Sequence, residues 1–297
     1  MDLLVIGLDG LSYNMLDRFD IDFPYLEKTR ANGVSGDLMS VDTPTTIPAW
    51  TSFATGKDPG SHGIHSMKRV TRDYQHGPAE TNKTDPAIYD FLDDTLLINL
   101  PASEGRVPSA ENSYVQSSML STSKEEMVPR ELQDLDTYEQ YEPMHDPTKK
   151  KRPNQYLDHV IEIANSREKF AREAFETHNP SVGFVLFSTT DWAGHILAKL
   201  TSEEERRDFY RRLVTQVAES TERLAELCDN VVLMSDHGFE RKHRTVHLAD
   251  WLHDNGYMME QARSEGTDSA VDRALDQAAD AAVTPGKTIS RHSDRLY

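Results

Sequence analysis

The chain has 297 residues, 37% of them hydrophobic, so it is long enough to form one large core and is not a disordered protein. Its 50 Asp and Glu outnumber 32 Lys and Arg, and the net charge of −18 argues against partners such as duplex nucleic acid or an anionic membrane. No apolar run reaches the ~20 residues of a membrane-spanning helix. The single cysteine, Cys228, excludes an internal disulfide and a cysteine-rich zinc module.

These properties predict a cytoplasmic protein with no membrane partner. The excess of acidic residues fits a halophilic source, where salt screens self-repulsion, and equally an ordinary acidic cytosolic protein. Composition alone does not separate the two.

The N-terminal segment begins with the pattern of a buried strand. The run 3–8 is short and apolar throughout, which is typical of a strand covered on both faces of a parallel sheet. After it we predict helices over 11–18 and 24–32, a strand near 34–40, and a helix from Pro48 to Thr55 with Pro48 in its first position.

Periodicity weakens over residues 66–153. Polar turns, a short apolar run at 96–100 and the basic cluster Lys149-Lys150-Lys151-Arg152 predict an inserted cap that selects substrate. The basic cluster could contact a substrate phosphate, although a solvated loop is the preferred interpretation.

Regular patterns return after residue 153. We predict a helix over 154–177, a strand at 183–187, a helix over 203–228 and a strand at 230–234, and residues 264–285 read as a surface helix or a tail. Strands that alternate with helices indicate an α/β fold with a mostly parallel central sheet flanked by helices. The predicted division is an α/β core of residues 1–65 and 154–260, a cap of 66–153, and a C-terminal helix or tail of 261–297.

Each of the three clearest strands is followed by side chains that can bind a metal. Asp9 follows the first, Asp191 and His195 the second, and Asp236 and His237 the third. In open α/β sheets, ligands gather at the carboxyl ends of the strands. Oxygen and imidazole donors without a thiolate favour Zn²⁺ or Mn²⁺. Taken singly, a strand-terminal Asp is more often a helix cap, and Asp191 with His195 fits an ordinary surface pair four residues apart.

A hydroxyl group precedes the helix predicted from Pro48. At a helix N-terminus, free N–H groups and the helix dipole stabilise an oxyanion or a phosphate. Thr46, beside a metal, could ionise there and act as a nucleophile, whereas in isolation it reads as a plain N-cap.

Taken together, these segments resemble the alkaline phosphatase superfamily, and most closely its type I phosphodiesterase/nucleotide pyrophosphatase branch. The matching motifs, in the family's order, are Val5-Ile6-Gly7-Leu8-Asp9-Gly10, Thr46-Ile47-Pro48-Ala49-Trp50-Thr51-Ser52-Phe53-Ala54-Thr55-Gly56 with Pro59 to Ile64, Asp191-Trp192-Ala193-Gly194-His195, Ser235-Asp236-His237-Gly238-Phe239, and Val246-His247-Leu248-Ala249-Asp250-Trp251-Leu252. The region between residues 65 and 180 matches nothing in the family.

The resemblance implies two divalent metal ions, zinc in preference to manganese. One would be held by Asp9, Thr46, Asp236 and His237. The other would be held by Asp191, His195 and a third ligand, for which His247 is favoured, His292 is the alternative and His243 is a weaker candidate.

The activity that the resemblance implies is hydrolysis of a phosphodiester or pyrophosphate bond in a small phosphate ester, through a phospho-threonine intermediate on Thr46. The alternatives are another metal-dependent phosphoryl-transfer enzyme, such as a phosphomonoesterase or a phosphoglycerate-mutase-like enzyme, and a catalytically silent relative that binds a ligand. Nucleotide pyrophosphatases carry an Asn shortly after the nucleophile where this chain has Ala49, so nucleotide specificity is not implied.

Overall fold

The computed structural model describes residues 1–70, 76–78, 85–101, 103, 112–115, 124, 127–240 and 245–258. The chain divides into two units, Met1–Glu240 and Arg241–Tyr297, and each is described by itself.

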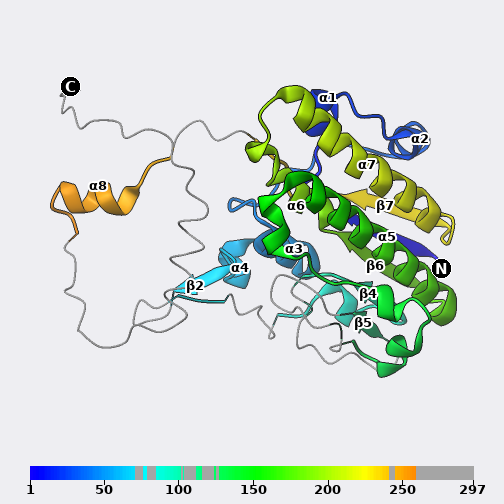
Figure 1. Cartoon of the computed structure of the whole chain (residues 1–297). Coiled ribbons are helices and arrows are strands. Elements are labelled where there is room, and N and C mark those ends of the chain that lie inside the picture. The colour runs from blue at the N-terminus through cyan, green and yellow to red at the C-terminus, as the bar shows by residue number, and fades with distance from the viewer. Residues whose placement is uncertain are drawn as a thin grey trace. The chain divides into compact units, whose positions relative to one another are not determined.

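The first unit is built on a five-stranded sheet in which all neighbouring strands run parallel. The order across the sheet is β5 (Ser113–Val115), β4 (Thr95–Ile98), β6 (Val182–Phe187), β1 (Leu3–Leu8) and β7 (Asn230–Met234) (Figure 1). The parallel sheet predicted from the alternation of strands and helices is confirmed. Because β1 lies between β6 and β7, the residues that follow these three strands meet at one edge of the sheet.

Helices cover both faces of this sheet. On one face lie α1 (Tyr13–Phe19), α5 (Pro153–His178) and α7 (Glu203–Ala225), which share a core with Ile6, Val185 and Phe187. In Figure 1, α5 and α7 run side by side in front of the sheet. The helix α3 (Thr46–Thr55) packs on the other face, through a second core that contains Trp50, Leu97 and Phe184.

The remaining elements of the first unit are short, apart from one helix of nine residues. They are α2 (Pro24–Asn32), α4 (Pro59–His62), the hairpin of β2 (Lys68–Val70) and β3 (His76–Pro78), α6 (Thr189–Gly194), and the 3₁₀ turns η1 (Ile88–Asp90), η3 (Arg130–Asp134), η4 (Tyr138–Gln140), η5 (Pro147–Lys151) and η6 (Leu197–Lys199). In the second unit the structure describes α8 (Leu248–Asp254). None of the helices in the described part of the chain combines the length and apolarity needed to span a bilayer.

Aromatic packing fixes the position of α3. The Trp50 ring makes edge-to-face contacts with Phe53 and Phe184, at centroid distances of 5.6 and 5.7 Å. A Cβ atom at Gly7 would lie 2.7 Å from Trp50 Cη2, so glycine at this point of β1 lets the indole reach the sheet. This packing holds the first turn of α3, which carries Thr46, at the edge where β1 ends.

Three predictions about elements differ from the structure. Residues 34–40 form no strand: Val34, Leu38 and Met39 are exposed, so this segment has no apolar face to bury against a neighbour. The run at 96–100, expected within the cap, contributes the buried strand β4 to the central sheet, so the sheet extends into the segment 66–153. The helix predicted to begin at Pro48 begins two residues earlier, at Thr46. N–H groups in the first helical turn have no acceptor within the helix, so proline is tolerated at any position of that turn. Residues 264–285 lie outside the described part of the chain.

Candidate metal centre

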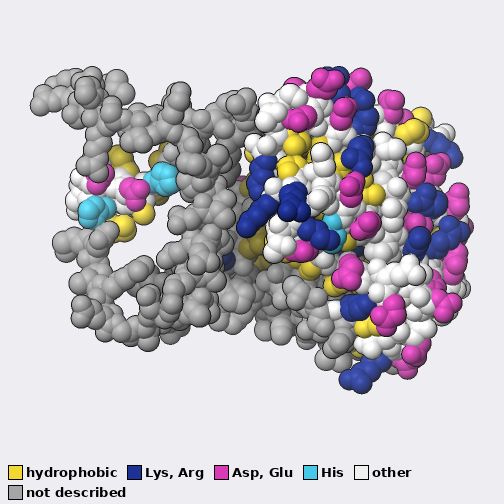
Figure 2. Space-filling model, in the orientation of Figure 1, with side chains coloured by type: hydrophobic (Ala, Val, Ile, Leu, Met, Phe, Trp, Pro, Cys, Tyr) yellow, Lys and Arg dark blue, Asp and Glu magenta, His cyan; other side chains and the backbone are white. Residues whose placement is uncertain are grey.

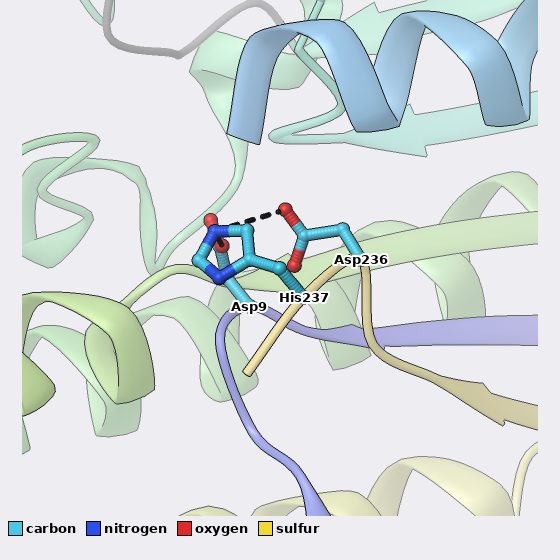
Figure 3. A group of neighbouring side chains, drawn as sticks. All are labelled: Asp9, Asp236 and His237. Atoms are coloured by element: carbon cyan, nitrogen blue, oxygen red, sulfur yellow. Dashed lines mark ion pairs between the residues drawn. The ribbon is translucent and has the colours of Figure 1, made fainter. Parts of the chain in front are cut away.

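Four side chains from three elements converge at the carboxyl edge of the sheet. Asp9 follows β1, Asp236 and His237 follow the neighbouring strand β7, and Thr46 is the first residue of α3. Ligand atoms of Asp9, Asp236 and His237 all lie within 4.8 Å of one another, and their side chains point toward a common centre (Figure 3). The predicted convergence of Asp9 with Asp236 and His237 is therefore found.

The distances among these atoms match the spacing of ligands around one metal ion. Thr46 Oγ1 lies 3.4 Å from Asp9 Oδ1 and 3.4 Å from His237 Nε2. His237 Nε2 lies 3.6 Å from Asp9 Oδ1 and 3.4 Å from Asp236 Oδ2. Ligands placed tetrahedrally at about 2.0–2.2 Å from a zinc ion are about 3.3–3.6 Å apart. These four separations are the ones expected between ligands of a zinc-sized cation.

Two carboxylate oxygens of this group form no hydrogen bond with the described residues. They are Asp9 Oδ2 and Asp236 Oδ2, and both are buried. A buried carboxylate oxygen without a hydrogen bond is costly, and a bound cation removes that cost. The donor set of oxygen and imidazole fits a zinc-like or manganese-like ion.

Burial and mutual repulsion disfavour the charged forms of the acids. Burial raises the pKa of Asp9 well above its ordinary value, and the negative charges of Asp236 and Asp191 raise it further. Burial also raises the pKa of Asp191 and of Asp236, against the opposing effect of His237. A cation bound among them would reverse this balance, because its charge favours ionised ligands.

Asp191 and His195 form a second, smaller group beside the first. Both lie on or just after α6, one helical turn apart, and His195 Nε2 is 3.5 Å from Asp191 Oδ1. Asp191 Oδ1 is 4.0 Å from His237 Nε2, so the two groups adjoin. The side chain of Asp191 is buried, whereas that of His195 is 62% exposed and accessible to a ligand.

The predicted third ligand of this second group lies in the other unit. His247 is exposed and occupies the N-cap position of α8. His243 and His292 lie outside the described residues. The assignment of His247 stays a prediction.

Backbone contacts that the sequence did not reveal hold the acids in place. Thr190 Oγ1 donates to the carbonyl of Asp9 at 2.5 Å, and Ser40 Oγ donates to the carbonyl of Asp236 at 2.5 Å. The Gly10 N–H donates to Asp236 Oδ1 at 3.2 Å, which ties the ends of β1 and β7 together. Hydroxyl-to-carbonyl contacts of this kind leave no periodic signal in a sequence.

Phe239 is a further residue of the site that received no role from sequence. Its ring lies edge-on to the rings of His195 and His237, at 5.2 and 6.0 Å. A Cβ atom at Gly10 or Gly194 would lie 2.6 or 2.5 Å from Phe239 Cε2, so both glycines leave room for this ring. Gly10 follows Asp9 and Gly194 follows Asp191, and these two glycines are the sequence signal that could have indicated a bulky ring at the site.

A family model matches nearly the whole chain. Residues 3–294 match the family model described as type I phosphodiesterase / nucleotide pyrophosphatase. No curated protein matches the chain.

Two solved structures show the same fold. Phosphonoacetate hydrolase from Sinorhizobium meliloti, solved with phosphonoacetate, has a TM-score of 0.57 at 17% identity, over 86% of this chain and 62% of that one. The wild-type alkaline phosphatase PafA has a TM-score of 0.53 at 16% identity, over 85% of this chain and 65% of that one. This chain therefore spans less than two thirds of the length of either protein.

Proposed function

Because the chain belongs to the type I phosphodiesterase/nucleotide pyrophosphatase family, we propose that it is a metal-dependent hydrolase of phosphodiester or pyrophosphate bonds with Thr46 as its nucleophile. The observation that carries this proposal is that the Thr46 hydroxyl lies 3.4 Å from both Asp9 Oδ1 and His237 Nε2, within the group of metal-binding side chains. A threonine that served only at a helix start would not need its hydroxyl group this close to two metal-binding side chains.

Asp9, Thr46, Asp236 and His237 would hold one divalent ion, and Asp191 and His195 with His247 would hold a second. When bound, such ions act as Lewis acids that favour the ionised forms of a hydroxyl group and of water. Zinc is the preferred identity on the donor set, with manganese as the alternative.

The protein's own groups define the rest of the reaction. Thr46 Oγ1 attacks phosphorus, loses its proton and displaces the leaving group, which gives a phospho-threonine. Water then cleaves this ester and regenerates the Thr46 hydroxyl. The N–H groups of Thr46 and Ile47 have no acceptor within α3, so the helix start offers donors to the phosphoryl oxygens in both steps.

A panel of three esters tests the proposed function. The metal-loaded protein should hydrolyse bis-p-nitrophenyl phosphate and the p-nitrophenyl ester of thymidine monophosphate faster than p-nitrophenyl phosphate. A preference for p-nitrophenyl phosphate would instead support the phosphomonoesterase alternative. Absence of turnover on all three, together with less than one metal ion bound per chain, would support the silent ligand-binding alternative.

A further inference from the structure

Phe239 lies between the two groups of the metal centre. Its ring is edge-on to His195 of the second group at 5.2 Å, and to His237 of the first group at 6.0 Å. His237 follows β7, whereas His195 follows α6, so these two side chains come from separate segments of the chain. The Phe239 ring therefore contacts one imidazole from each group without supplying a ligand atom itself.

Two glycines leave space for the Phe239 ring. A Cβ atom at Gly194 would lie 2.5, 2.7 and 2.9 Å from three carbon atoms of this ring, and a Cβ atom at Gly10 would lie 2.6 Å from it. Gly10 has a positive φ of 69°, which suits glycine in any case. Gly194 is different, because it belongs to the helix α6, where alanine is ordinarily the more stable residue. The close approach of the ring gives the physical reason for glycine at this helical position.

The two imidazoles that touch Phe239 are held to different degrees. The His237 side chain is 10% exposed, and its Nε2 lies 3.4–3.6 Å from Asp236, Thr46 and Asp9. The His195 side chain is 62% exposed, and its Nε2 lies 3.5 Å from Asp191 Oδ1. Among the described residues the His195 side chain makes no hydrogen bond. An exposed imidazole with so few contacts has other rotamers open to it, so the ring contact is a main restraint on His195.

The charge around α6 makes the second group sensitive to the placement of its ligands. On the face shown in Figure 2, Lys and Arg side chains gather where Figure 1 places α6. Burial raises the pKa of Asp191, and the positive charge of Lys150 is among the influences that lower it. Nearby positive charge disfavours a bound cation. A metal ion at the second group therefore depends on ligands that are already held in the correct orientation.

We propose that Phe239 is a positioning residue for the second metal ion, and that its ring holds His195 in the rotamer that places Nε2 beside Asp191. The assignment rests on the proposed function, because that function includes a metal ion bound by Asp191 and His195. Phe239 also contacts His237, but the surrounding acids and Thr46 hold that imidazole without the ring. Loss of the ring should therefore weaken the second site much more than the first.

The first test displaces the Phe239 ring without changing any ligand. In Gly194→Ala the new methyl group overlaps the ring, which must move away. Zinc is titrated into the chelator-treated variant in competition with a chromogenic chelator, and urea unfolding verifies that the variant is folded. The affinity for the second zinc ion should fall by about tenfold or more, as is typical when a residue that orients a metal ligand is lost. The affinity for the first zinc ion should stay within a few-fold of the wild type.

The matched control is Gly36→Ala, because a Cβ atom at Gly36 meets no atom within 4 Å. It should bind both zinc ions as the wild type does. Equal affinity of Gly194→Ala and wild type for the second zinc ion would overturn the assignment, and so would an equal loss at both sites.

A double-mutant cycle shows whether the methyl group acts through the ring. Phe239→Ala alone should weaken the second site about as much as Gly194→Ala does. Adding Gly194→Ala to Phe239→Ala should cause no further loss, because no ring remains for the methyl group to displace. A further loss as large as that caused by Gly194→Ala alone would mean that the methyl group disturbs His195 directly, and the role of Phe239 would be rejected.

The last test needs neither metal nor substrate. The imidazole carbon–proton signals of the metal-free protein are recorded by NMR, and the His195 signal is identified by its absence in His195→Ala. The nearby ring should displace this signal from that of the exposed His65, and Phe239→Ala should bring the two signals together. A His195 signal that does not respond to Phe239→Ala would overturn the assignment, even in an active hydrolase.

The metal titration also separates this assignment from the proposed function. A chain whose second zinc ion depends on Phe239, but which hydrolyses none of the three esters, would contradict the proposed function and support the role of Phe239. A chain that hydrolyses the diesters and binds its second zinc ion equally well in Phe239→Ala would do the reverse.

Discussion

Asp9 carries the largest electrostatic penalty among the residues of the site. It is fully buried, one of its oxygens has no hydrogen bond among the described residues, and Asp236 and Asp191 both repel its charge. The raised pKa means that, without metal, the folded state holds a proton on Asp9 at a pH where the unfolded chain has lost it. The free energy of unfolding attributable to this group is therefore highest at acidic pH and falls as the pH rises through the raised pKa.

Asp9→Asn should accordingly stabilise the metal-free protein at mildly alkaline pH, because the amide replaces a carboxylate that must ionise in a buried place. The measurement is urea unfolding in the presence of a chelator, at acidic and at mildly alkaline pH. The variant should show a smaller loss of stability on going to the higher pH. With zinc present the order should reverse, since the wild type keeps a ligand that the variant lacks. A metal-free variant less stable than the wild type at alkaline pH would contradict this account of the site.

Thr46 is tested by removing and by conserving its hydroxyl. Thr46→Ala should lower kcat on bis-p-nitrophenyl phosphate by about a thousandfold or more, because no nucleophile remains, whereas Thr46→Ser should keep measurable turnover. Both variants should keep most of their bound metal, since Asp9, Asp236 and His237 remain. An alanine variant within a few-fold of the wild-type rate would make Thr46 a helix-start residue only, and Thr45 the next candidate.

The sequence predicted most of these residues, because strands that end in Asp or His are visible as apolar runs followed by a donor. It did not predict Thr190, Ser40 or Phe239. Their contacts depend on where separate loops meet at the sheet edge, and that meeting is decided by packing rather than by local pattern.

At the scale of elements, Arg167 of α5 links a helix to the sheet beneath it. This fully buried side chain donates to the carbonyl of Leu186 in β6 at 2.7 Å and to that of Pro143 at 2.8 Å. Arg167→Ala would leave both carbonyls without this donor and empty the space of a long side chain.

We expect Arg167→Ala to lower the free energy of unfolding by about 3 kcal/mol, from the loss of charge-assisted hydrogen bonds in a buried place. The matched control is Arg212→Ala, which breaks the exposed pair of Arg212 with Asp158 between α7 and α5 and should cost less than about 1 kcal/mol. Urea unfolding of both variants gives the comparison. Equal losses would show that Arg167 does not anchor α5.

The elements that the sequence predicted well are those with long or uninterrupted patterns. The strand β1 and the helices α5 and α7 fall where apolar runs and helical periodicity placed them. The strand predicted at 34–40 is absent, because the apolar residues of this segment have no neighbouring element against which to be buried. The run at 96–100 was assigned to the wrong layer, since a short buried strand looks the same in a cap and in a central sheet.

At the scale of the whole molecule, the proposed second metal site needs a histidine in addition to Asp191 and His195, and we predict that it is His247. His247 belongs to the unit Arg241–Tyr297, whereas Asp191 and His195 belong to Met1–Glu240. A cytoplasmic location and a halophilic source likewise stay predictions, because composition is their sole support.

Metal stoichiometry of two variants decides this assignment. His247→Ala should bind one zinc ion fewer than the wild type, because the second group would be left with Asp191 and His195 alone. His292→Ala should keep the wild-type content. The opposite pattern would transfer the ligand role to His292.

The proposed hydrolase depends on metal bound among Asp9, Thr46, Asp236 and His237. The most direct test is to titrate zinc into the chelator-treated protein and to follow hydrolysis of bis-p-nitrophenyl phosphate. We expect no turnover without metal and a rate that rises with added zinc until the second equivalent is bound, with Thr46→Ala inactive throughout. Turnover by the metal-free protein, or an equal response to zinc in wild type and Thr46→Ala, would contradict it.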